Sequence, residues 1–521
     1  MSQLSLAQIQ DFKGKYPRQL WFLFLSEMWE RFCFYGMRGM LTLFMVDKLV
    51  GLSMTDSDAQ LHYGATQAFI YAFTFIGGLF ADKIIGFRKS LFWGGLMMIT
   101  GSAILAINPH DFFFWGISFT VIGTGFFKPN ISTMVGLLYR DGDNRRDAGF
   151  SAFYSGINIG ALLGGALCVY VGKHYSWNLA FGFAGIVMTI SLLTFVFTKR
   201  TLGPIGLSPL LANTPKENQL EIEGVETAPV EQELVDFKVP KNKRWYEYAT
   251  YIGSLAVIPL IYLMIDNTDY TDWFMYIIGP LTLIYLFYEM SKYSRAERKK
   301  LLAALVFIIF SILFWAIYEQ AGGSLSLFAA RNLNTSFLGV VNLDPNSVNN
   351  GANSLFVIVF AFIFSLIWLG LAKRKIEPNT VVKFGLGFLF LGAGYFLFYS
   401  LRFFAGMDGK SSLNMFVLAY LVVTFGELAL SPIGLSIMTK LSPKPLQGMM
   451  MGMWFLASAY GQYLAGILGA GLSQGNTGDT NAQNLLTYTA GYRHFAIYAI
   501  IAGVLLLIIS PWIRKLMQNV K

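Results

Sequence analysis

Apolar runs of about 20 residues recur along the whole chain, and this recurrence limits the possible folds more than any other feature. A helix that crosses a bilayer needs about 20 consecutive, mostly apolar residues. Of the 521 residues, 55% are apolar and 13% are charged, against about 25% charged in soluble domains. The sequence therefore predicts an all-α polytopic membrane protein with fourteen transmembrane helices. The runs lie at 20–46, 63–81, 90–107, 112–138, 151–171, 178–198, 248–265, 272–290, 301–330, 353–372, 384–401, 413–438, 447–471 and 491–513.

Lys and Arg residues are distributed unevenly between the connections of these runs. Thirty of the 39 lie in connections on the side of the N-terminus, six lie on the opposite side, and three lie inside the runs. Because positively charged connections stay in the cytoplasm, we expect both termini to be cytoplasmic and the protein to lie in the cell inner membrane. The net charge of +9 is then a topology signal, so no nucleic-acid partner is expected, although a basic surface for anionic lipid fits equally well.

One long polar connection divides the chain. Residues 199–247 are acidic in the middle and basic at both ends, a composition typical of a cytoplasmic linker that is partly disordered. Six runs precede it, two follow it, and six more come after a basic connector at 291–300. We expect a six-helix bundle at 1–199, a linker with two inserted peripheral helices at 200–300, and a second six-helix bundle at 301–521.

Ionisable side chains inside the runs are few and are the best guide to function. A charge at bilayer depth costs several kcal/mol and usually faces a bundle interior or a wet cavity. Four acids and three bases suggest mutual pairing with one carboxylate left to exchange protons, and the alternative is a set of structural salt bridges. The seven residues are Glu27, Glu30, Arg31, Arg38, Lys128, Glu319 and Glu427.

The first run carries a polar stripe. At about 100° per residue, five polar side chains fall within about 140° of one face. A stripe of this height on an apolar helix must face water or other polar groups. Its members are Glu27, Glu30, Arg31, Tyr35 and Arg38.

The remaining buried charges lie near residues that can bend a helix. Lys128 directly precedes a proline, a second proline follows Glu427, and a Gly pair follows Glu319. Such positions free backbone carbonyls that only a polar cavity tolerates. Asn158 lies among glycines spaced four apart, which indicates either close helix packing or a polar cavity.

Neither the histidines nor the cysteines suggest catalysis. Each of the four histidines lies at an outer edge of a run, so carboxylates would have to carry any coupled protons. Both cysteines lie in apolar runs without metal-ligand spacing and are expected to be free, buried thiols. We therefore expect neither an enzyme nor a bound cofactor. The residues concerned are His62, His110, His174, His494, Cys33 and Cys168.

Several segments resemble one known family. The segment 27–36, GluMetTrpGluArgPheCysPheTyrGly, resembles the ExxER signature of proton-dependent oligopeptide transporters, a branch of the major facilitator superfamily. Segments 77–89 and 153–162 are similar to the family's signatures in the loop between helices two and three and in helix five. Segments 426–436 and 451–456 resemble its helices ten and eleven. The resemblance covers nearly the whole chain, including the inserted helix pair.

This resemblance implies proton-driven symport of di- and tripeptides into the cytoplasm by alternating access of two six-helix halves. The proton gradient would take the place of a cofactor, and the bilayer would hold a functional monomer. Two alternatives stay open: a related carrier for another small anion or amino-acid derivative, and a channel or structural membrane protein. The segment 77–89 is interpreted as a conformational gate.

The resemblance also assigns residues. It implies that Arg31 and Lys128 attract the peptide carboxylate. It implies that Glu427, with Asn353, Asn158 and Asn130, meets the amino end, and that Tyr35, Tyr71 and Trp454 line side-chain pockets. It further implies proton coupling through Glu27, Glu30 and Glu319, and an outer latch between Arg38 and Glu319. The chain departs from the family at Phe34, where a tyrosine is usual.

Overall fold

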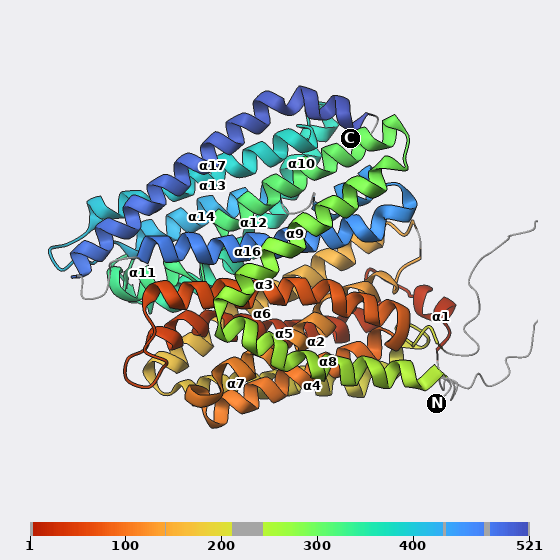
Figure 1. Cartoon of the computed structure of the whole chain (residues 1–521), viewed down its shortest axis with the longest axis horizontal. Coiled ribbons are helices and arrows are strands. Elements are labelled where there is room, and N and C mark those ends of the chain that lie inside the picture. Colours follow the sequence, from red (N-terminus) through yellow and green to blue (C-terminus); the bar gives the residue numbers. More distant parts are fainter. Residues whose placement is uncertain (1–3, 141, 211–242, 431–433, 474–479, 519–521) are drawn as a thin grey trace, which may run out of the picture.

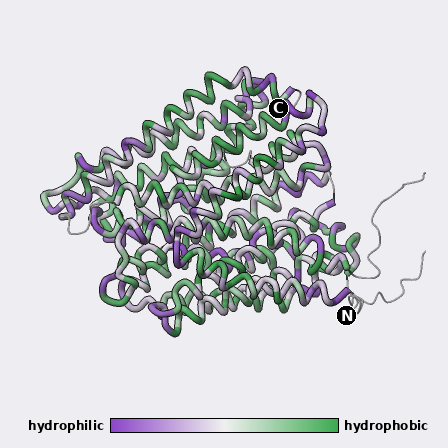
Figure 2. Tube along the Cα trace, in the orientation of Figure 1, coloured by the Kyte–Doolittle hydropathy of each residue, from purple (hydrophilic) through white to green (hydrophobic). Residues whose placement is uncertain are grey.

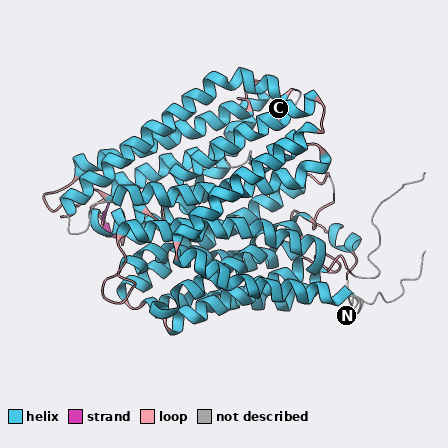
Figure 3. Cartoon of the chain, viewed as in Figure 1, coloured by secondary structure: helices cyan, strands magenta, loops and turns pink. Residues whose placement is uncertain are grey.

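The computed structural model describes residues 4–140, 142–210, 243–430, 434–473 and 480–518, and these residues are helical almost throughout (Figure 3). The first part contains α1 (Leu6–Gln10), α2 (Arg18–Val46), α3 (Asp56–Phe80), α4 (Phe87–Ile107), α5 (Pro109–Gly136), α6 (Arg145–His174) and α7 (Trp177–Thr198). The inserted pair is α8 (Arg244–Asp266) and α9 (Thr268–Ser291). The last part contains α10 (Arg295–Tyr318), α11 (Ser324–Asn332), α12 (Pro345–Lys373), α13 (Thr380–Ser400), α14 (Leu413–Leu430), α15 (Gly434–Leu441), α16 (Gln447–Ser473) and α17 (Asn481–Met517). A short hairpin pairs β1 (Ser336–Phe337) with β2 (Val341–Asn342).

The helices are long enough to cross a bilayer. Eleven helices in the described residues are long and apolar enough to do so by length and composition. Helices α2, α5 and α16 have 29, 28 and 27 residues. At about 1.5 Å per residue, each helix is longer than the thickness of a hydrocarbon core, which is about 30 Å. The first two of these carry charged side chains within their apolar stretches, which lowers their hydropathy. The predicted all-helical membrane fold is confirmed, while the count of fourteen spans stays a prediction.

The helices form two bundles that lie side by side (Figure 1). Buried apolar side chains form one large core between Ile9 and Ile265 and a second between Leu286 and Met517. Apolar residues follow the helices for most of their length, and hydrophilic residues gather mainly at the helix ends (Figure 2). The first and last described residues lie at the same end of the molecule, and α11 lies at the opposite end (Figure 1).

The inserted helices lie on the outside of the bundles. Helix α8 packs on the first bundle, where Tyr262 stacks on Trp115 with ring centroids 4.5 Å apart and Ser254 accepts a 2.9 Å hydrogen bond from Trp93. Helix α9 runs along the seam, where Tyr463 of α16 donates a 2.6 Å hydrogen bond to Asp272. Both helices are mainly exposed, with 28% and 17% of their apolar segments buried.

The start of the expected linker is folded, which differs from the expectation of a loose segment beginning at 199. Residues 199–202 form a 3-10 turn, and the residues after it cover the sharp turn between α3 and α4. Arg88 donates hydrogen bonds of 2.6 Å to Ile205 O and 2.5 Å to Gly203 O. These carbonyl oxygens provide hydrogen-bond partners for the charged Arg88 side chain, which the sequence analysis considered only as part of the segment 77–89. The predicted disorder falls mainly on 211–242, outside the described residues.

Helices α3 and α16 bring the two bundles into backbone contact. A Cβ atom on Gly64 would lie 2.7 Å from the Cα of Gly466, and one on Gly466 would lie 2.7 Å from the carbonyl oxygen of Gln60. Without a hydrophobic force between helices in lipid, such close approach of small residues is a main source of association. This crossing therefore ties the first bundle to the second.

Filling the crossing tests this conclusion. We expect Gly466→Val to lower the free energy of unfolding in detergent by about 1–3 kcal/mol, the usual cost of overpacking, because the added methyl groups meet backbone atoms. The matched control is Gly471→Val on the same helix, where no atom of the described residues lies within 4 Å of an added Cβ. Equal effects of the two substitutions would contradict a close crossing.

Candidate functional site

A buried charge cluster lies on the polar stripe of α2. The Nε of Arg31 is 3.1 Å from Glu27 Oε1 and 2.5 Å from Glu30 Oε2, and all three side chains are almost fully buried. Within the described residues, Arg31 Nη2 and Glu27 Oε2 have no hydrogen-bond partner. Because an unpaired buried polar group is costly, the cluster is suited to receive a polar ligand.

Lys128 of α5 adds a second cation close to this stripe. Its Nζ lies 4.3 Å from the ring centroid of Tyr71 and 5.8 Å from that of Phe34, which are cation–π distances. In the described part of the chain, no carboxylate oxygen lies within the 4.0 Å of an ion pair with Lys128. The expected helix break at this residue is absent, because α5 continues through Pro129 and its non-helical torsion angles lie at Phe112.

Glu427 of α14 is the centre of a hydrogen-bonded group in the second bundle. Tyr318 donates from its hydroxyl at 2.5 Å and Asn353 donates from Nδ2 at 2.8 Å, both to Glu427 Oε2. Asn353 also lies 2.7 Å from the Tyr318 hydroxyl and 3.1 Å from Thr424 Oγ1. Sequence reasoning missed Tyr318 and Thr424. The position of Tyr318 directly before Glu319 was the available signal.

Helix α10 ends between Tyr318 and Glu319, which is the first residue of a turn. The expected single run at 301–330 is two helices, since α10 ends at Tyr318 and α11 begins at Ser324. Glu319 therefore leaves the helix and pairs with Arg38 of α2. Arg38 also donates a 2.7 Å hydrogen bond from Nε to the Tyr63 hydroxyl. A Cβ on Gly322 would collide with that hydroxyl, so the turn needs glycine there.

Further polar contacts join the bundles at this same end. Arg331 Nη2 lies 2.6 Å from Asp56 Oδ1, and Lys173 Nζ lies 2.5 Å from Asp344 Oδ1. Ser347 donates a 3.0 Å hydrogen bond to the carbonyl oxygen of Ala166. These residues lie at or near the helix ends on the side away from both termini. The two bundles are thus held together at one end of the molecule.

The remaining predicted site residues each have their own contacts within the bundles. Tyr35 lies beside Arg38, whose guanidinium carbon is 5.8 Å from the ring centroid. Asn158 donates at 2.9 Å to the Tyr154 carbonyl of its own helix, and Trp454 packs on Gly434 of α15. Asn130 donates at 2.7 Å to both Ser90 Oγ and Phe126 O.

These contacts decide two open points. Asn130 is satisfied inside the first bundle and 1% exposed, so we leave it out of the peptide site. The glycines around Asn158 serve helix packing, since a Cβ on Gly160 or Gly164 would meet backbone carbonyl oxygens of α2.

Two helix bundles with opposite charges at their centre and polar contacts at one end are the architecture of a membrane transporter. The sequence profile of the POT family matches residues 88–209 and 261–484. The chain belongs to the POT family of proton-dependent oligopeptide transporters, as the sequence predicted, and is therefore a transporter and not an enzyme.

Curated relatives and solved structures match the chain over nearly its whole length. It is 34% identical to the peptide transporter YePEPT of Yersinia enterocolitica over 97% of this chain and 96% of the relative. It is 32% identical to a di-/tripeptide transporter of Lactococcus lactis, with 97% of each chain covered. The crystal structure of a peptide transporter POT in complex with sulfate has a TM-score of 0.79 at 30% identity, covering 99% of this chain and 100% of that one. A POT family transporter in complex with 5-aminolevulinic acid has a TM-score of 0.80 at 28% identity, covering 98% and 100%.

The ion pair between Asp56 and Arg331 is expected to stabilise the closed end. In a double-mutant cycle of Asp56→Asn and Arg331→Gln, thermal unfolding should give a coupling energy of roughly 0.5–3 kcal/mol, because both groups are partly buried. The control cycle uses Asp82 and Lys83, whose side chains are 62% and 73% exposed, and should give a value near zero. A coupling no larger than that of the control would show that the pair does not hold the bundles together.

Proposed function

We propose that this protein is a proton-coupled symporter that moves di- and tripeptides across the membrane. The observation that carries the proposal is the separation of opposite charges between the bundles. Arg31 and Lys128 lie in the first bundle, and Glu427 lies in the second. The names of the curated relatives, which include di-/tripeptide transporter, support the same substrate class.

The chemistry of a peptide fits this arrangement. A zwitterionic peptide carries a carboxylate at one end and an ammonium group at the other. Lys128 and the free Nη2 of Arg31 would bind the carboxylate, and Glu427 would bind the ammonium group through Oε1, since Tyr318 and Asn353 both donate to Oε2. Charge-assisted hydrogen bonds of this kind are the strong ones. Binding at both ends would draw the two bundles together.

Side-chain selectivity would come from the surrounding aromatic residues. Tyr35 and Tyr71 lie next to the cations of the first bundle, and Asn158, Asn353 and Trp454 complete the proposed substrate-contacting set. Amphipathic rings of this kind combine apolar contact with hydrogen bonding.

Proton coupling would act through buried carboxylates. When ionised, Glu319 pairs with Arg38 and keeps the outer end closed. Protonation would remove this attraction and favour opening to the outside. Glu27 and Glu30 share Arg31, so a proton on either one would release the guanidinium for the peptide carboxylate. Each step links a proton to a change in peptide access.

The proposal also covers the number of spans, the domain bounds, the orientation in the membrane and the oligomeric state. We propose fourteen transmembrane helices, with α2, α5 and α16 added to the eleven apolar ones. The halves would be 1–199 and 301–521, with 200–300 holding the linker and the inserted pair. Both termini would face the cytoplasm in the cell inner membrane, and the monomer would be the functional unit, driven by the proton gradient without a cofactor.

A second candidate function is transport of a small amino-acid derivative. The observation that favours it is a POT family structure in complex with 5-aminolevulinic acid. This ligand also carries an ammonium group and a carboxylate. Uptake into proteoliposomes separates the candidates: competition by several dipeptides supports the first, whereas competition by 5-aminolevulinic acid alone supports the second.

Neutralising Glu427 tests the amino-end assignment. We expect Glu427→Gln to weaken binding of a zwitterionic dipeptide by about ten- to a hundredfold, since a hydrogen bond to a charged group contributes about 1.5–3 kcal/mol. Binding of the N-acetylated dipeptide, which has no ammonium group, should change far less. Calorimetry measures both. The control is Glu289→Gln, which removes a carboxylate from an exposed pair on α9. Equal losses for the two ligands would contradict the assignment.

Neutralising Glu319 tests the coupling step. In Glu319→Gln, peptide counterflow without a proton gradient should persist, whereas uphill uptake driven by the gradient should be lost, because the latch no longer responds to protons. The control is Glu377→Gln, which breaks the exposed pair with Lys383. If both transport modes survive in Glu319→Gln, the coupling carboxylate lies elsewhere, with Glu27 or Glu30 next to be tested.

A further inference from the structure

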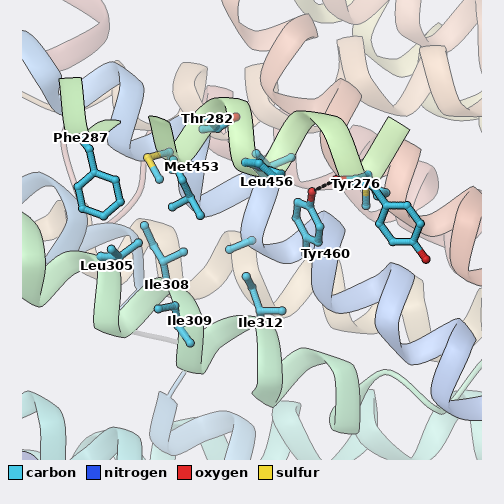
Figure 4. A pocket seen from close by; sticks show the side chains of 15 residues that line it. Tyr276, Thr282, Phe287, Leu305, Ile308, Ile309, Ile312, Met453, Leu456 and Tyr460 are labelled. Atoms are coloured by element: carbon cyan, nitrogen blue, oxygen red, sulfur yellow. Dashed lines mark hydrogen bonds between the residues drawn. The ribbon is translucent and has the colours of Figure 1, made fainter. Parts of the chain in front are cut away.

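A long apolar groove lies between α9, α10 and α16, and none of the residues that line it is charged (Figure 4). Its volume is about 460 Å³. Side chains from the three helices point into it, with Phe287 and Leu305 at one end and Tyr276 and Ile312 toward the other (Figure 4). Nothing in the peptide mechanism uses this groove.

Two of the hydroxyl groups that line the groove already donate hydrogen bonds within the protein. The Tyr460 hydroxyl donates to the carbonyl oxygen of Met275, and Thr282 Oγ1 donates at 2.6 Å to the carbonyl oxygen of Ile278. A polar ligand would therefore lose its hydration without gaining these bonds. The groove is suited to hydrocarbon.

The groove opens to the bilayer and has the length of one acyl chain. Tyr276 and Ile309 are 62% and 55% exposed on a surface that faces lipid. From Met275 to Phe287 the lining extends over thirteen residues of α9, a rise of about 18 Å. This length is close to the about 15 Å of hydrocarbon in one leaflet. The groove crosses the middle of α9 and extends farther toward the end of the molecule that holds the chain termini.

The end of the groove meets a basic connector. Residues 291–300 contain five Lys or Arg residues and one Glu. Arg298 precedes Leu305 by seven residues, which places it on the same face of α10, about two turns beyond the groove. Its Nε and Nη2 donate to Tyr293 O at 2.8 Å and Ser291 O at 2.6 Å. These bonds hold the guanidinium on the connector, beyond the end of the groove on α10.

We propose that this groove is a binding site for an anionic phospholipid, with one acyl chain in the groove and the headgroup phosphate at Arg298. The acyl chain fills the space that α9 leaves against α10 and α16, and the phosphate complements the positive connector. The lipid then joins the loosely packed α9 to the second bundle. This inference stands on the groove and the connector, independently of the transported substrate.

Native mass spectrometry tests the site. The purified full-length protein is given equal amounts of dioleoyl phosphatidylglycerol and dioleoyl phosphatidylcholine, which share their acyl chains. We expect phosphatidylglycerol to be retained in preference. Ile309→Trp fills the groove and should abolish this retention, while Ile186→Trp, at a 62% exposed position on α7, should not. Thr282→Phe fills the groove from α9 and replaces Ile309→Trp if that variant aggregates.

The headgroup contact has its own variants. Arg298→Gln should reduce the retained phosphatidylglycerol about fivefold, the contribution of one basic residue near anionic lipid. Arg298→Lys should retain it, and so should Lys299→Gln, whose side chain points about 100° away. Equal retention of the two lipids by the wild type, unchanged retention in both groove-filling variants, or the same loss in Arg298→Gln and Lys299→Gln would each overturn the proposal.

Discussion

A charge inside a hydrocarbon core must have a partner, and the rest of this structure depends on that constraint. Each buried charge on α2 is paired. Arg31 lies between two carboxylates of its own helix, and Arg38 reaches across to Glu319 of the second bundle. Pairing within one bundle stabilises that bundle alone. The pair of Arg38 and Glu319 joins the two bundles, together with the ion pairs Arg331–Asp56 and Lys173–Asp344 at the same end.

The remaining charges divide between the bundles without meeting. Lys128 rests on aromatic rings, and Glu427 is held by neutral donors. Both are stabilised less than a direct ion pair would stabilise them, so a ligand with both charges can complete the site. Glycines at the α3–α16 crossing hold the halves close enough for this. In the proposed function, a dipolar ligand that bridges these two charges would also draw the bundles together around it.

The sequence predicts the membrane fold well, because long apolar runs have few alternatives. It also predicts the α2 stripe, since spacing on a helix is visible in one dimension, whereas the Arg38–Glu319 pair was implied by the family resemblance. It does not predict where α10 ends or that Tyr318 bonds to Glu427, because these depend on tertiary packing. The partners of Asn130 are hidden for a similar reason: a polar side chain in a run can be hydrogen-bonded within its own bundle.

The distance between the bundles at the closed end tests the central claim most directly. Spin labels at Leu49→Cys and Val340→Cys, which are 93% and 83% exposed, report it once the buried Cys33 and Cys168 are replaced by alanine. At neutral pH we predict one short distance, with a longer component at acidic pH. In Glu319→Gln the longer component should be present at both pH values. A Glu319→Gln variant with the short distance and pH response of the parent protein would contradict the account.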